Sequence, residues 1–168
     1  MSHSITITRT TTTSTEGGLY LNCGYMRSFP GLLKLAQVLL GAACVGVMGY
    51  YWDRDYTSRY NGQKPEFFYM LVAVTFFINT FCLLSSYIVS FKTASFVSRT
   101  SYEVIYHGIA FIFYLAAGLT LLLEVNHRKN DYYKNYDPYL AASIMGLVMS
   151  ALYLISTILA NRQTIHYF

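Results

Sequence analysis

The sequence predicts an all-α membrane protein: a four-transmembrane-helix bundle with short loops and a disordered N-terminal tail. Only 12% of its 168 residues are charged, against about 25% in an average soluble domain. The charges also leave four uncharged stretches of eighteen to twenty-five residues, at 35–52, 67–91, 104–123 and 138–161. A hydrocarbon core of about 30 Å needs about 20 helical residues, so each stretch is long enough to cross a bilayer.

Soluble bundles and membrane β-barrels both fit this pattern poorly. A helix of a soluble bundle carries a polar stripe along one face, and "GIAFIFYLAAGLTLLL" (108–123) has none. A barrel needs many segments of about ten residues with alternating polarity, which the chain lacks. Helices satisfy every backbone group internally, as lipid requires.

The chain ends are expected to be short and polar. Residues 1–29 are predicted to form a disordered cytosolic tail, because they are rich in Thr and lack the apolar core of a signal peptide. Cys23 lies just before the first span, where palmitoylation is plausible and an unmodified thiol is the alternative. Residues 162–168 are predicted to form a second short cytosolic tail. The odd number of cysteines predicts no disulfide framework.

Between the tails, residues 30–161 are predicted to form the membrane domain. The expected helices run over about 31–52, 67–91, 102–123 and 139–160. Pro30 suits the first turn of the first helix, and Thr100 with Glu103 has the capping-box spacing that opens the third. For the fourth helix, Asp137 is expected to be the N-cap and Pro138 to lie in the first turn.

Orientation depends on the flanking charges. Six Lys and Arg lie on each side of the predicted spans, so the positive-inside rule alone does not decide. When the acidic residues are included, the net charge is +4 on the side of the termini and zero on the other side. We therefore expect both termini in the cytosol.

Polar side chains inside a span need partners because lipid cannot solvate them. Asn79, at the middle of the second span, and Gln37, one turn into the first, are predicted to make interhelical hydrogen bonds. A substrate or ion contact is the alternative for Asn79.

Glu103 and His107 are four residues apart and face the same side of the third helix. Helix capping is the favoured role of Glu103, because a proton relay needs a further partner and no second acid is expected inside the other spans. The pair alone cannot hold a metal. The sequence has no catalytic residues and no motif for a metal or cofactor, so we expect no enzyme.

Small residues recur at a spacing of four on the first and fourth helices, where they let backbones approach closely. Packing inside the bundle is favoured over packing between copies. The residues are Ala42, Gly46, Ala142, Gly146 and Ser150.

Three segments resemble one known family. "RSFPGLLKLAQVLLG" (27–41) is similar to the opening of the MARVEL domain found in plasmolipin, the myelin and lymphocyte protein and the chemokine-like-factor-related tetraspan proteins. "YEVIYHGIAFIFYLAAGL" from Tyr102 and "YLAASIMGLVMSALYLISTILA" from Tyr139 resemble its third and fourth spans.

The resemblance implies a non-enzymatic, membrane-organising protein of vesicle trafficking, membrane apposition, junctions or cholesterol-rich membrane domains. Its place would be the plasma membrane, endosomes or secretory vesicles. Expected partners are membrane lipids, including cholesterol, and further copies or other membrane proteins, but no nucleic acid. Two loose cholesterol-contact patterns are present, at 47–54 and 64–71. The alternative is a small transporter or channel subunit in which Asn79, Glu103 and His107 line a path.

Overall fold

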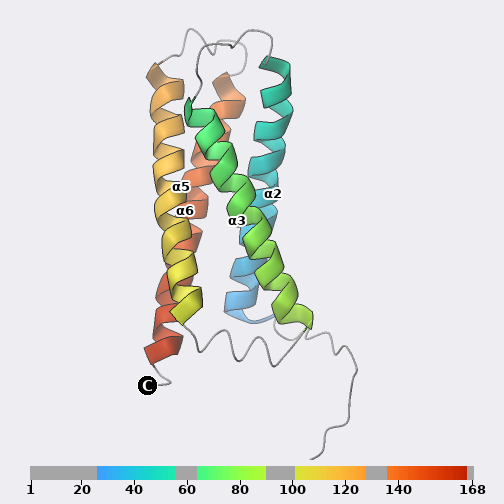
Figure 1. Ribbon diagram of the computed structural model, residues 1–168, viewed down its shortest axis with the longest axis vertical. Coiled ribbons are helices and arrows are strands. Elements are labelled where there is room, and N and C mark those ends of the chain that lie inside the picture. The colour runs from blue at the N-terminus through green and yellow to red at the C-terminus, as the bar shows by residue number, and fades with distance from the viewer. Residues whose placement is uncertain (1–25, 56–63, 90–100, 128–135, 166–168) are drawn as a thin grey trace, which may run out of the picture.

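The computed structural model describes residues 26–55, 64–89, 101–127 and 136–165 and contains four long helices (Figure 1). Each is apolar and long enough to cross a membrane, and the described residues contain no strand. The helices are α2 (Phe29–Asp55), α3 (Lys64–Val89), α5 (Ser101–His127) and α6 (Tyr136–Ile165). The predicted fold class is therefore confirmed.

The helices form a ring in which α2 contacts α3, α3 contacts α5, α5 contacts α6, and α6 contacts α2. Two pairs, α2 with α5 and α3 with α6, consequently face each other across the diagonals. The first turn of α2 and the last turn of α6 lie at the same end of the bundle (Figure 1). We call this the terminal end, and the other the loop end.

The helix ends differ from the expected ones. α2, α5 and α6 extend beyond the predicted bounds at both ends, and α3 begins at Lys64, earlier than the predicted 67, and is described as far as Val89. The prediction stopped helices at the first charge, whereas a helix continues into the polar headgroup region as long as its backbone hydrogen bonds are made. The predicted tail and loops lie mostly outside the described residues.

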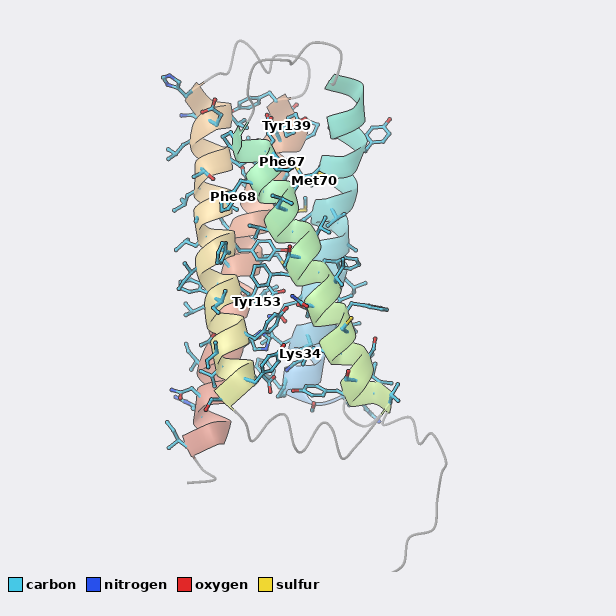
Figure 2. The ribbon with its side chains drawn as sticks, viewed as in Figure 1. Lys34, Phe67, Phe68, Met70, Tyr139 and Tyr153 are labelled. Carbon is cyan, nitrogen blue, oxygen red and sulfur yellow. The ribbon has the colours of Figure 1, made fainter. Side chains whose placement is uncertain are left out.

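Tyrosines fill much of the interior. Five of the largest fully buried side chains are tyrosines, and Figure 2 shows Tyr139 toward the loop end and Tyr153 nearer the terminal end. A tyrosine combines a large apolar ring with a hydroxyl that needs a partner when buried. The core is therefore apolar in bulk but contains hydroxyl groups along its length. The five are Tyr69, Tyr87, Tyr114, Tyr139 and Tyr153.

The most extensive helix contact is between α5 and α6. Gly118 of α5 lies directly against Leu147 of α6: a Cβ at Gly118 would come 3.1 Å from the Leu147 Cδ2 and 3.3 Å from its backbone nitrogen. A glycine at this position lets the two backbones approach, as at other helix interfaces in membranes.

Candidate functional site

The most polar site of the described chain is a buried ion pair near the terminal end. Lys34 of α2 donates a hydrogen bond to Glu103 of α5, and both residues are at most 5% exposed. Tyr87 of α3 completes the group: its hydroxyl donates to Glu103 Oε2 at 3.0 Å, and Lys34 Nζ lies 5.1 Å from its ring centroid. Figure 2 places Lys34 inside the bundle. We call Lys34, Tyr87, Glu103 and the adjacent His107 the charged cluster.

His107 is the least satisfied member of the charged cluster. Its Nε2 lies 3.6 Å from Glu103 Oε1, too far for a hydrogen bond, and neither ring nitrogen has a hydrogen-bond partner among the described residues. The ring is instead packed between aromatic rings, with centroids 5.0 Å from Tyr106 and 5.7 Å from Tyr153. The predicted pair of Glu103 and His107 is thus adjacent, but the strong partner of Glu103 is Lys34.

The expectation for Glu103 needs correction in two respects. Its carboxylate binds side chains of two other helices, so capping is not its main role; the expected capping partner, Thr100, lies outside the described residues. A further acid is also buried in a span, because Glu66 in the first turn of α3 is fully buried, at the loop end.

Sequence reasoning missed Lys34 because it was counted as a flanking charge. The available signal was its setting in "LLKL" (32–35), with Phe29 and Pro30 before it. A cation one turn inside an apolar helix must be paired or reach the interface, and Glu103 was the acid closest to the same end.

A second polar group lies deeper in the bundle, around Thr80 of α3. Thr80 donates its single hydroxyl proton to the Phe76 carbonyl oxygen at 2.7 Å. Its oxygen is then left to accept from the hydroxyls of Tyr106, at 2.7 Å, and Tyr153, at 2.6 Å. The Tyr106 hydroxyl also reaches the Phe76 carbonyl oxygen, at 3.3 Å. This hydroxyl group joins α3, α5 and α6. It was not predicted, because a threonine in an apolar span carries no signal of its partners.

Gln37 forms an interhelical contact between α2 and α6. The fully buried side chain donates from Nε2 to Ser156 Oγ at 2.8 Å. Beside it lies a cavity of about 10 Å³, lined by Lys34, Glu103 and Ser156 and by apolar residues of α2 and α6. That volume is about the minimum for one water molecule.

The small residues of α6 face inward. Ala142, Gly146 and Ser150 are all buried, and the first two receive Tyr69 from the diagonally opposite α3. The Tyr69 hydroxyl donates to the Ala142 carbonyl at 2.5 Å. A Cβ at Gly146 would lie 2.6 Å from Tyr69 Cε2, so only glycine fits beside the ring. Ser150 Oγ donates to the Phe111 carbonyl at 3.5 Å, on α5.

The small residues of α2 face outward, contrary to the favoured expectation of internal packing. Ala42 and Gly46 are exposed, and a Cβ at Gly46 would meet nothing within 4 Å. Spacing alone could not decide this, because a run of small residues has the same period on either face of a helix.

Asn79 also lies on the outer surface. The residue is exposed, and its amide makes no hydrogen bond within the described part of the chain. The predicted hydrogen bond within the bundle is therefore wrong, and Asn79 does not line a path with the buried Glu103 and His107. Cys23, the predicted palmitoylation site, lies outside the described residues.

The polar groups mainly hold helices together. The charged cluster joins α2 to α5 across one diagonal, and Thr80 with Tyr153, and Tyr69 with Ala142, join α3 to α6 across the other. No group of three or more His, Cys, Asp or Glu that could hold a metal occurs among the described residues.

Comparison with protein families gives one match. The MARVEL model, described as a membrane-associating domain, matches residues 25–159, which is most of the chain and includes nearly all of the four helices. No curated protein and no solved structure matches the chain.

Proposed function

Since the chain belongs to the MARVEL family of membrane-associating domains, we propose that it is a non-enzymatic membrane-organising protein, which acts in vesicle trafficking or in cholesterol-rich membrane domains through the lipids that its outer surface selects. The family match over residues 25–159 is the observation that carries this proposal.

The distribution of polar groups supports it. The charged cluster and the Thr80 hydroxyl group are buried and bound to neighbouring helices, whereas large exposed apolar side chains occur on all four helices. A protein of this kind presents lipid with a mostly apolar surface, and its lipid specificity depends on the shape and length of that surface. Examples are Leu39 on α2, Leu71 on α3, Ile112 on α5 and Ile158 on α6.

The length of the spans suggests which lipids are preferred. The candidate spans contain 23, 25, 27 and 27 residues. The longest uncharged stretches within them, 67–89 and 138–161, reach about 35 Å at 1.5 Å per residue, against a hydrocarbon thickness of about 30 Å. α3 crosses the bundle obliquely (Figure 1), and tilt takes up part of the excess. The remainder favours thick membranes, such as sterol-rich ones.

Reconstitution in lipids of graded thickness tests the proposal. The full chain, labelled outside the spans, is placed in giant vesicles that separate into thick sterol-rich and thin sterol-poor phases. We expect the thick phase to be enriched in protein. Equal partition, or preference for the thin phase, would contradict the proposed lipid selection.

A matched pair of variants on α5 isolates the effect of span length. Leu123→Lys places a charge at a position that is 67% exposed and shortens the apolar surface, whereas Asn126→Lys adds the same charge at an exposed position beyond it. We expect the first variant to shift toward the thin phase and the second to keep the wild-type partition. A shift of both would assign the effect to charge.

The same vesicles separate this proposal from the transporter alternative. Asn79 does not share a path with Glu103 and His107, so the three-residue path on which that alternative depended is not formed. A proton or solute flux through the purified protein that is lost on His107→Leu, a variant expected to remain folded, would support transport. Imaging a tagged copy beside plasma-membrane and endosome markers tests the trafficking role.

A further inference from the structure

The outer surface of α3 carries a polar stripe consisting of Thr75, Asn79, Cys82 and Ser86. All four residues are exposed. They follow one another at spacings of four, three and four, and at 100° per residue they fall within a sector of about 60°. The other large exposed residues of α3 are apolar, among them Leu71 and Phe81. Small residues such as Thr, Cys and Ser are typical of surfaces on which membrane helices pack, and an Asn amide facing lipid is unfavourable unless something covers it.

The spacing is that of a heptad seam. Spacings of three and four repeated along a helix mark the a and d positions, at which a second helix packs in a left-handed pair. In this register Asn79 and Ser86 occupy a positions, and Thr75 and Cys82 occupy d positions. A single Asn at an a position is a known determinant of register and of oligomeric state.

Asn79 is the residue of the stripe that most needs a partner. Ser86 satisfies its hydroxyl within its own helix, donating to the Cys82 carbonyl at 2.8 Å. The Asn79 amide, with two donor hydrogens and one acceptor oxygen, has no hydrogen bond in the described chain. In water it would be solvated. At the middle of a 25-residue apolar span it faces lipid.

We propose that the polar stripe of α3 is the interface of a homodimer, in which the Asn79 amides of two copies hydrogen-bond to each other. An amide is complementary to itself, because each copy offers a donor where the other offers an acceptor. The stripe carries no charge, so two like surfaces do not repel.

Membrane topology fixes the geometry. All copies cross the membrane in the same direction, so two α3 helices can pair only in parallel, about a two-fold axis along the membrane normal. Such an axis places each a or d residue opposite its own copy. Asn79 therefore meets Asn79, and Cys82 meets Cys82. The outward small residues Ala42 and Gly46 are on another helix and play no part in this interface.

Cys82 gives a direct test. In a full-length Cys23→Ser/Cys44→Ala background, Cys82 is the only thiol. The protein is oxidised in lipid vesicles with oxygen, and copper phenanthroline is the catalyst. Two thiols form one disulfide, and oxygen accepts the two electrons that are released. We expect a covalent dimer that reducing agent reverses. Asn79→Leu should weaken dimerisation by about three- to tenfold, the range expected for one interhelical hydrogen bond.

Two controls make the test decisive. The exchange Ile78→Asn/Asn79→Ile keeps the composition but turns the amide 100° away from the stripe, and it should lose crosslinking as Asn79→Leu does. Gly46→Cys, with Cys82 replaced by Ser, puts a thiol on the exposed surface of α2 and measures random collision. Each variant is first shown to be folded by circular dichroism. Crosslinking of Cys82 no faster than that of Gly46→Cys, or unchanged by Asn79→Leu, would overturn the proposal.

Discussion

Lys34 and Glu103 form a buried ion pair between α2 and α5, two helices that are not neighbours in the ring. The pair therefore holds together one diagonal of the bundle, where backbone packing contributes little. Tyr87 of α3 binds both members, through its hydroxyl and its ring. Three of the four helices thus meet at one carboxylate.

Glu103→Gln should be strongly destabilising, because it leaves the Lys34 ammonium buried without a counter-charge. Breaking one side of a buried pair costs about 3–5 kcal/mol. Unfolding in mixed micelles with rising sodium dodecyl sulfate measures the loss. The double variant Lys34→Met/Glu103→Gln removes both charges and should recover most of the stability. A double variant as unstable as Glu103→Gln would show that the charge pairing is not the cause.

Gly146→Leu and Gly46→Leu should behave differently, although both replace a glycine in a small-residue pattern. Gly146 faces the Tyr69 ring, and the new side chain must displace it together with its hydrogen bond to Ala142. Overpacking of this kind costs about 1–3 kcal/mol. Gly46 has open space around it. Thermal denaturation in detergent should therefore show a lower midpoint for Gly146→Leu alone. Equal shifts of the midpoint in the two variants would contradict the finding that Gly146 faces the interior and Gly46 the outer surface.

Thr80→Val should cost about 1–2 kcal/mol, because the buried Tyr153 hydroxyl loses its acceptor and the Tyr106 hydroxyl keeps only the Phe76 carbonyl oxygen, at 3.3 Å. Thr120→Val on α5 is the matched control, since the exposed Thr120 bonds only to its own helix, at the Ala116 and Ala117 carbonyls. Chemical unfolding followed by tyrosine fluorescence measures both variants. Similar losses would mean that the contacts between helices add nothing to those within one helix.

His107→Leu should leave the free energy of unfolding unchanged or raise it by about 1 kcal/mol. The imidazole is fully buried, and neither nitrogen has a hydrogen-bond partner among the described residues. Replacing an unsatisfied polar group by an apolar one of similar size removes a desolvation cost. Steric-trap unfolding in bicelles is suitable for detecting a gain. A loss of more than about 1 kcal/mol would contradict this prediction.

Some of the site could be read from the sequence. The apolar length of each span and the positions of the prolines and charges predicted the helices, because lipid thickness sets a length that any spanning helix must meet. Gln37, Glu103 and His107 were singled out because a polar residue in a span is rare enough to be noticed. Lys34 was not singled out, because it lies near a helix end. Thr80 was not singled out, because threonine is common in spans.

The direction in which each residue faces could not be read in the same way. In water an inward face is more apolar than an outward one, but lipid is as apolar as the core, so the two faces of a span look alike. Ala42 and Gly46 were therefore expected inside, although they face out, and Asn79 was expected to bond within the bundle.

The sequence by itself thus determined that four helices span a membrane, since that depends only on the number of consecutive apolar residues. The tertiary structure decided which polar groups meet. It brought Lys34 to Glu103 from 69 positions away and left the stripe of α3 facing outward. Partners across a diagonal depend on how each helix is rotated and tilted, and packing against the other three helices sets both.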